Sequence, residues 1–196
     1  MDRLAETSGV SRAMISKIER GESSPTAVLL GRLSAALELS VSELLTGARL
    51  GDGREPAAAG PPAADRAGPP DPPDPPGSAD PNGAGLVRRT ADTPQWRDPD
   101  TGYLRRQIST ASFPAAVTEV TLPPHARVPY PAAAYAFIAQ LVWVLSGQLT
   151  LVDGSVRRVL GPGDTFELGQ PRSREFINQT GQDCRYVVVV TRKSTA

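Results

Sequence analysis

Residues 8–21, SGVSRAMISKIERG, decide the fold of the N-terminal region. Gly9 stands where two short helices would have to turn sharply, and glycine accepts the positive φ that such turns often need. Ser11 follows as a suitable N-cap, because its hydroxyl can accept a hydrogen bond from an unpaired N–H of the next helix. Ile15 and Ile18 lie three residues apart, on one face of that helix. Small, polar and basic residues occupy the other face: Ser11, Arg12, Ala13, Ser16, Lys17 and Arg20. The pattern predicts a helix-turn-helix whose second helix presents these six residues to a DNA groove.

Two further helix starts follow this stretch. Ser24 is a suitable N-cap with Pro25 at the first helical position, opening an apolar run over residues 27–37. Ser40 and Glu43 have the spacing of a capping box ahead of another short helix. The alternative is an ordinary helical hairpin whose basic face is merely solvated, and the two added helices make that alternative less favoured.

The run from Leu4 to Leu45 resembles the helix-turn-helix of the phage-repressor (Xre) family of bacterial regulators, including the "ISKIERG" ending and the "SSPT" that follows it. The resemblance covers helices two to five of the family pattern and implies a DNA-binding domain over residues 1–46. That family has a first helix ahead of the segment that begins here at Asp2. We therefore expect either a start upstream of Met1 or a truncated regulator with a weakened DNA-binding domain.

Charge and cysteine content limit the class of protein. The chain has 21 basic and 21 acidic residues, and its first fifty residues hold six of each. We therefore expect DNA binding to depend on local charge and on dimerisation rather than on a global field. The single cysteine, Cys184, excludes an intrachain disulfide and fits a reducing compartment. No apolar run approaches the roughly 18 residues of a membrane span. We expect a soluble cytoplasmic protein.

Residues 47–85 change the character of the sequence, being mostly Ala, Gly, Pro and Asp. Such a segment has little apolar surface to bury and is predicted to be a disordered, partly extended linker. Its length predicts that the regions on either side are loosely tethered and cannot transmit a rigid rotation to each other.

From residue 86 to 194 the pattern becomes strand-like. Short apolar runs bounded by Gly, Pro or Asp-Gly turns are predicted as strands: 103–108, 116–122, 137–145, 148–152, 155–160, 165–168, 173–178 and 185–191. Many short strands with no helices between them favour a β-sandwich or barrel. The expected fold class is therefore a multidomain α plus β protein, with an incomplete, lambda-repressor-like helix-turn-helix followed by a β-barrel.

This β-rich region resembles the cupin fold, a double-stranded β-helix barrel, with a core at about 115–191. The matching residues are 142–150, 160–164, Pro171 and Asn178. Catalytic members hold a divalent metal with histidines and a glutamate, and the corresponding places here are Ala133, Tyr135, Gln140 and Arg174. These cannot bind a metal in the expected way, since arginine has no lone pair to give. His125, the only histidine, lies in a loop and is expected at the surface. We therefore expect no metal, no cofactor and no enzymatic activity.

The residues at those places suggest a different use of the barrel. Tyr135, Gln140 and Arg174 would bring a phenol, an amide and a guanidinium to one barrel mouth, a set that could hold a small carboxylate or polar metabolite. The alternative is that they are drifted positions with Arg174 turned to solvent.

The sequence as a whole predicts a sequence-specific DNA-binding transcriptional regulator. We expect a metal-free cupin domain that senses a small molecule or mediates dimerisation, and a homodimer on a two-fold double-stranded operator, with no membrane partner. The alternative is a cupin-fold binding protein or enzyme whose truncated helical arm does not bind DNA.

Overall fold

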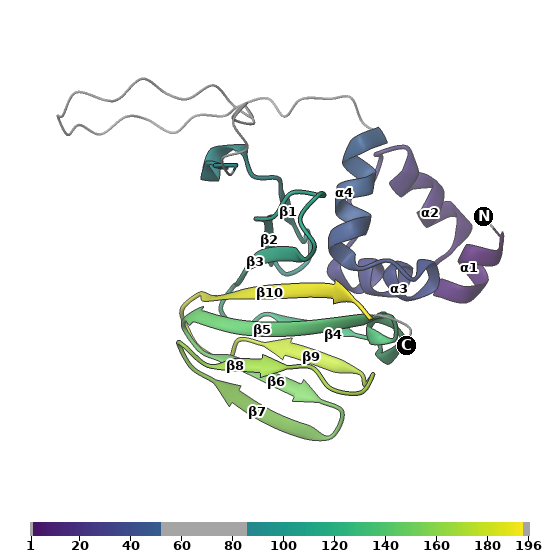
Figure 1. Cartoon of the computed structure of the whole chain (residues 1–196). Coiled ribbons are helices and arrows are strands. Elements are labelled where there is room, and N and C mark those ends of the chain that lie inside the picture. The colour runs from purple at the N-terminus through teal and green to yellow at the C-terminus, as the bar shows by residue number, and fades with distance from the viewer. Residues whose placement is uncertain (1, 52–85, 194–196) are drawn as a thin grey trace, which may run out of the picture.

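The computed structural model describes residues 2–51 and 86–193. The N-terminal part is a group of four helices, and the rest is built from β-strands (Figure 1). The helices are α1 (Asp2–Ser8), α2 (Arg12–Glu19), α3 (Ala27–Leu37) and α4 (Val41–Gly51). Helix α4 continues five residues beyond the predicted domain end at residue 46. The remainder of the predicted linker, residues 52–85, lies outside the described residues.

Helices α1 and α2 form the predicted turn. Gly9 has φ of +64°, and the Ser11 hydroxyl accepts a hydrogen bond from the Met14 N–H at 3.3 Å, as the N-cap prediction requires. Val10 at the corner and Ile15 on α2 are buried together with Leu33 of α3. A small apolar core therefore fixes the angle between α1 and α2 and leaves the other face of α2 exposed.

The start of α3 differs from the prediction. Thr26, not Ser24, is the N-cap: its backbone is extended and its hydroxyl accepts from the Leu29 N–H at 3.3 Å. Pro25 consequently lies before the helix rather than at its first position. Ser24 and Thr26 flank Pro25, and either hydroxyl could cap the helix, so the sequence pattern did not distinguish between them.

The capping box at the start of α4 is confirmed. The Glu43 N–H donates to the Ser40 hydroxyl at 3.1 Å, and the Ser40 N–H donates back to Glu43 Oε2 at 2.7 Å. Both ends of this reciprocal pair satisfy N–H groups that would otherwise lack a partner at the helix start.

Within the described residues, the strands form two antiparallel sheets (Figure 1). One has the order β1-β2-β3-β10-β5-β8 and the other β4-β9-β6-β7. The first six-stranded sheet contains β1 (Gln95–Arg97), β2 (Leu104–Gln107), β3 (Ala116–Leu122), β10 (Cys184–Arg192), β5 (Ile138–Ser146) and β8 (Thr165–Glu167). The second contains β4 (Arg127–Tyr130), β9 (Arg174–Ile177), β6 (Leu149–Asp153) and β7 (Val156–Leu160).

Each predicted strand is present, within one or two residues at either end, and two strands were missed. Strand β1 has three residues, too few for a periodic signal. Strand β4 contains Pro129, which made residues 127–130 resemble a loop. Proline is tolerated there because β4 is at the edge of its sheet.

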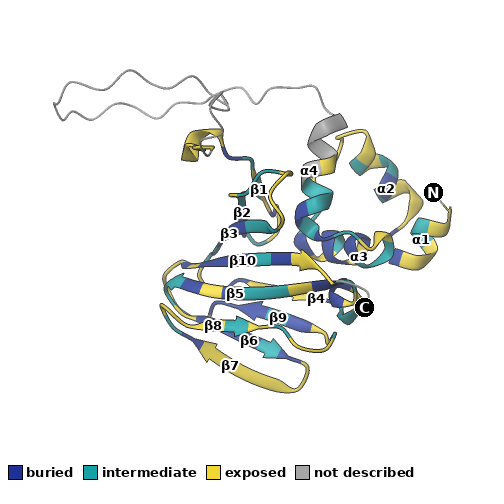
Figure 2. Ribbon diagram, in the orientation of Figure 1, coloured by how far each residue is buried: buried dark blue, intermediate teal, exposed yellow. Residues whose placement is uncertain are grey.

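The core lies between the two sheets, and Figure 2 shows the buried residues along the strands that enclose it. Val142, Val144 and Tyr186 project inward from the larger sheet, while Leu151 and Phe176 project from the smaller one. The turn after β5 needs glycine: Gly147 has φ of +76°, and a Cβ there would lie 2.6 Å from the Asp183 carbonyl oxygen.

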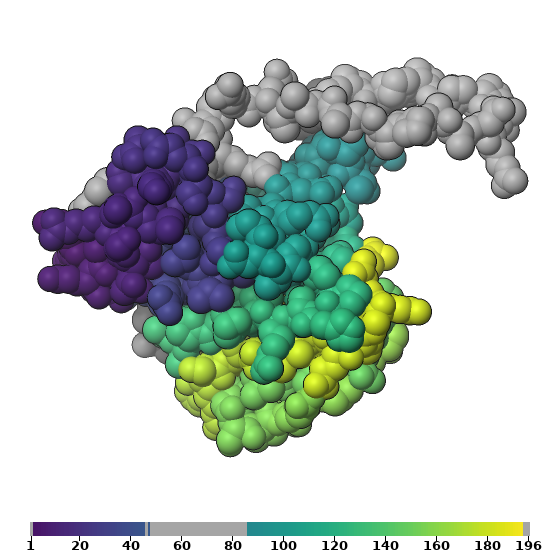
Figure 3. Space-filling model, turned by 180° about the vertical axis from the view of Figure 1, so that it is seen from behind, coloured from purple at the N-terminus to yellow at the C-terminus, as the bar shows by residue number. Residues whose placement is uncertain are grey.

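The helical part packs directly on the β domain, contrary to the predicted loose arrangement (Figure 3). Ala27 of α3 is buried within the main core, and its N–H donates to Asp98 Oδ1 at 3.3 Å. Gly31 lies against the Tyr130 ring, where an added Cβ would be 2.8 Å from Cδ1. Arg192 of β10 pairs with Glu43 of α4 at 2.9 Å. These contacts join residues on opposite sides of the linker, which spacing along the chain cannot reveal.

Candidate functional site

The first candidate surface is the outer face of α2. Of the six predicted DNA-contacting residues, Ser11, Arg12, Ala13, Lys17 and Arg20 are exposed and Ser16 is half-buried. Ile15, on the opposite face, is buried. The structure therefore brings the six residues onto the side of α2 that faces away from the small core, as an interface with DNA requires.

The basic residues of this face are partly occupied by neighbouring carboxylates. Arg12 Nη1 lies 2.9 Å from Asp2 Oδ1, and Arg20 Nε lies 2.6 Å from Glu22 Oε1. The hydrogen bond from Arg20 lowers the pKa of Glu22. Exposed ion pairs of this kind contribute about 0–1 kcal/mol, so phosphates can replace the carboxylates at little cost. Lys17 has no ion-pair partner in the part of the chain that the structure describes.

The second candidate surface is the barrel mouth, where the structure separates the three predicted residues. Tyr135, on the short helix η2 (Ala132–Tyr135), and Gln140 of β5 line a cavity of about 40 Å³. Arg174 does not line it. Arg174 Nε lies 2.9 Å from Asp153 Oδ1, its Nη2 donates to the Gln170 carbonyl, and its guanidinium lies 4.5 Å from the centre of the Tyr135 ring.

Arg174 is therefore a structural residue of the barrel wall, with no exposed side-chain surface. The alternative that Arg174 turns to solvent is wrong. Ala133, at another place where catalytic cupins carry a ligand, is exposed on η2 and does not face the cavity with Tyr135.

Sequence reasoning missed the main polar residues of the cavity. All four tyrosines of the chain line it, the additional three being Tyr103, Tyr130 and Tyr186. Arg105 joins them, and its Nη1 donates to the Tyr103 hydroxyl at 2.8 Å. Burial raises the pKa of Tyr130 and Tyr186 well above the ordinary value, so both phenols are neutral hydrogen-bonding groups at physiological pH. Alternation along residues 103–105 was a signal that Tyr103 and Arg105 share a face.

The remaining polar residues singled out in the sequence have structural positions. His125 is exposed in the turn between β3 and β4, with φ of +61°. Asn178 is fully buried, and its side-chain amide donates to the carbonyls of Leu122 and Gln182 at 2.9 and 2.7 Å. No group of three or more His, Cys, Asp or Glu side chains gathers among residues 2–51 and 86–193. In the same ranges no helix has the length and apolar character to cross a membrane.

Comparison with known proteins supports the prediction of a helix-turn-helix in the helical part. The helix-turn-helix family HTH_3 matches residues 1–44. The HTH-type transcriptional regulator SutR of Escherichia coli (strain K12) is 44% identical over 46 residues, which are 24% of this chain and 26% of that regulator. The match thus spans about a quarter of the curated relative. These matches confirm the predicted Xre-type helix-turn-helix at the N terminus.

Solved structures resemble the chain over a greater length. An HTH_3 family transcriptional regulator from Vibrio cholerae has a TM-score of 0.63 at 19% identity, with 97% of this chain and 85% of that chain covered. The Cupin_2 domain of an XRE family transcriptional regulator from Enterobacter cloacae has a TM-score of 0.42 at 14% identity, covering 45% and 95%. The likeness to the Vibrio cholerae regulator extends over both the helical and the β-rich part, in agreement with the predicted order of a helix-turn-helix followed by a β domain, which here has two antiparallel sheets.

Proposed function

We propose that this chain is a cytoplasmic, sequence-specific DNA-binding transcriptional regulator whose metal-free, cupin-like domain senses a small molecule or mediates dimerisation. The observation that carries the proposal is the exposed polar face of α2 within a helix-turn-helix that matches a DNA-binding family. Residues at the start of such a helix contact base edges, and those further along contact phosphates. Arg12 and Ala13 are the proposed base contacts, with Ser16, Lys17 and Arg20 continuing the face and Ser11 at its start.

The outer face of the six-stranded sheet supports a homodimer. Trp143 of β5 has 46% of its surface exposed and lies opposite Val187 of β10, while the neighbouring Leu141 lies opposite Val189. Because strand residues alternate, these four side chains share the face that points away from the core, where Val187 is already covered and Trp143 is the exposed member. A second copy of the chain would cover this apolar surface and provide two DNA-binding heads for a two-fold operator.

DNA binding is tested with an operator selected from random duplexes. Arg12→Ala should lose discrimination at one base pair, a cost of about 1–3 kcal/mol in binding free energy. Lys17→Ala should weaken binding to all DNA sequences alike and reduce the slope of log affinity against log salt concentration by about one. Arg157→Ala is the control, since Arg157 is exposed on β7, the strand farthest from the helices in Figure 1. The proposed face is refuted if Arg12→Ala and Lys17→Ala both bind like the control.

Dimerisation is tested by light scattering of the full chain. Trp143→Glu should produce a monomer and lower operator affinity, because a charge would be buried in the proposed interface. Val159→Glu is the matched control, since Val159 is 54% exposed but lies on the other sheet. A monomeric wild-type chain that still binds the two-fold operator tightly would contradict the dimer proposal.

A further inference from the structure

Arg105 is a buried cation that has no anionic partner in the part of the chain that the structure describes. It is 7% exposed and projects from β2 toward the barrel interior, since it pairs with the inward-facing Val120. Its Nη1 donates to the Tyr103 hydroxyl at 2.8 Å and its Nη2 to the Ser42 hydroxyl of α4 at 3.0 Å. Nε has no partner, and no carboxylate within the described ranges pairs with the guanidinium. A charge buried with only neutral partners carries a large desolvation cost.

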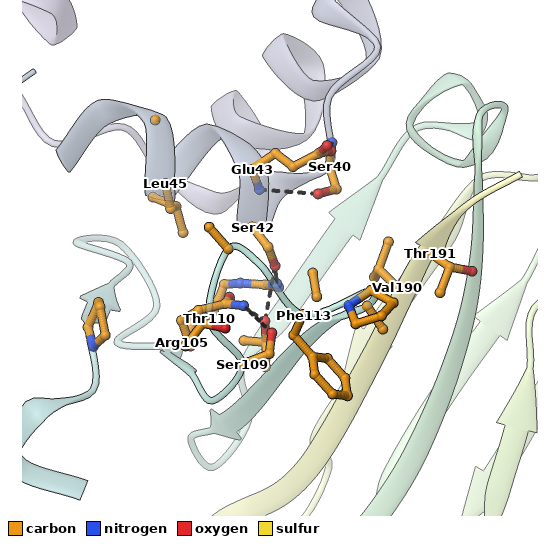
Figure 4. Close-up of a pocket in the computed structure, with 18 of the residues that line it drawn as sticks. Ser40, Ser42, Glu43, Leu45, Arg105, Ser109, Thr110, Phe113, Val190 and Thr191 are labelled. Carbon is orange, nitrogen blue, oxygen red and sulfur yellow. Dashed lines mark hydrogen bonds between the residues drawn. The ribbon is translucent and has the colours of Figure 1, made fainter. Parts of the chain in front are cut away.

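A large pocket opens beside this guanidinium. It has a volume of about 780 Å³ and is enclosed by α4, the segment between β2 and β3, and the end of β10 (Figure 4). Figure 4 shows Ser42 and Leu45 on the α4 side and Val190 and Thr191 on β10, with Arg105 between them. Arg105 lines both this pocket and the 40 Å³ barrel cavity, so its guanidinium lies where the two meet.

The charges that line the pocket favour an anion. The ionisable lining residues that the structure describes are Arg88, Arg105, Arg192 and Glu43. Glu43 is neutralised by Arg192, whereas Arg88 donates only to the backbone carbonyls of residues 108 and 109. Among the described residues, two positive charges are therefore left without a carboxylate partner, and one of them lies deep in the pocket.

We propose that this pocket binds a small amphipathic carboxylate, with its carboxylate on Arg105 and its hydrocarbon body toward the pocket opening. Guanidinium matches carboxylate in a bidentate arrangement, and a single deep arginine suits a monoanion. The Ser42 and Thr118 hydroxyls, 3.0 Å apart, lie beside this end. The body would contact the apolar lining, which is made of Leu45, Trp96, Phe113, Ile138 and Val190.

The position of the pocket gives the ligand a regulatory effect, and this part rests on the proposed function. One wall belongs to α4 and the other to the sheet, so a bound carboxylate contacts the helical head and the barrel together. By linkage, a ligand that binds the docked arrangement more tightly stabilises it to the same extent. Ligand binding therefore holds the head against the barrel and changes its affinity for the operator.

Fluorescence of Trp96 provides the binding assay. The chain has two tryptophans, so the full-length Trp143→Phe protein reports on Trp96 alone. The probes are sodium hexanoate and hexan-1-ol, which have the same chain length but differ in charge. We expect saturable hexanoate binding and at least tenfold weaker hexanol binding. Absence of a saturable hexanoate response, or equal affinity for the two probes, overturns the site.

Variants locate the binding group. Arg105→Gln should weaken hexanoate at least tenfold, whereas Arg106→Gln should match the parent, because Arg106 points to the other face and pairs with Glu119. If Arg105→Gln fails to fold, Arg105→Lys keeps the charge without the planar fork and should still bind hexanoate more weakly than the Arg106→Gln protein. An Arg105 variant that folds and binds hexanoate like the control overturns the assignment.

Operator binding by the wild-type full-length chain, which keeps Trp143 in the proposed dimer interface, separates the two proposals. DNA binding without hexanoate binding refutes the pocket and leaves the regulator intact. Hexanoate binding without DNA binding refutes the regulator and leaves the pocket. If both bind but hexanoate does not alter operator affinity, the proposed coupling between the pocket and the head is refuted.

Discussion

Replacing Gly31 by alanine tests whether the helical head is docked on the barrel. A Cβ at Gly31 would lie 2.8 Å from Tyr130 Cδ1, well inside van der Waals contact. Tyr130 cannot easily move away, because it is 8% exposed and its ring packs edge-on against Phe176 at 6.0 Å between centroids. Overpacking of this kind costs about 1–3 kcal/mol.

Gly47→Ala is the matched control, since Gly47 is also helical and a Cβ there meets no described atom within 4 Å. Alanine in place of glycine stabilises a helix by about 0.5–1 kcal/mol in both variants, so this gain cancels in the comparison. The free energy of unfolding of the Gly31→Ala protein should therefore be about 1–3 kcal/mol lower than that of the Gly47→Ala protein. At about 2–4 °C per kcal/mol, the melting temperatures should differ by about 2–12 °C.

The measurement is urea and thermal unfolding of both full-length variants, followed by circular dichroism. The docked arrangement predicts a less stable Gly31→Ala protein. If the two variants are equally stable, or if Gly31→Ala is the more stable, α3 does not pack against Tyr130 in solution and the docking argument fails.

Three other changes test particular contacts. Ser40→Ala removes the α4 cap and should lower the unfolding free energy by about 1 kcal/mol in urea titrations, with Ser11→Ala as a second cap for comparison. Asn178→Ala removes the side-chain donor to the buried Leu122 carbonyl and one of two donors to the Gln182 carbonyl. It should cost about 1–3 kcal/mol by the same measurement, and an unchanged midpoint would contradict the role of this buried amide. Burial alone would raise the pKa of Glu119, but its bonds to Arg185 and Arg106 outweigh this and lower it. The ionised Glu119 carboxylate thus stabilises the folded protein at pH values above its pKa in the unfolded chain. This stabilisation is lost as the pH falls through the lower pKa that Glu119 has in the folded protein. Glu119→Gln should lose less stability than wild type between pH 6 and pH 3, and parallel pH profiles would refute this.

The sequence alone determined the features that depend on neighbours in the chain. The turn at Gly9, the cap at Ser11 and the Ser40–Glu43 capping box each involve residues within a few positions of one another, so their residue types are sufficient evidence. Most strands were also predicted, because alternation and turn residues are local. Local patterns failed at two places. Two neighbouring hydroxyl residues competed as the N-cap of α3, and Pro129 hid the strand pattern of β4.

Only the tertiary structure decided how the two parts meet. Ser42 and Arg105 are 63 residues apart in the chain and share a hydrogen bond. Arg174 faces Asp153 and not solvent because β6 and β9 are neighbours in the sheet, which the residue type of Arg174 could not reveal. Arg105 is buried with hydroxyl partners and no carboxylate partner among the described residues, and this depends on what every surrounding element contributes. Long-range packing therefore placed the proposed ligand site, which no local pattern could have shown.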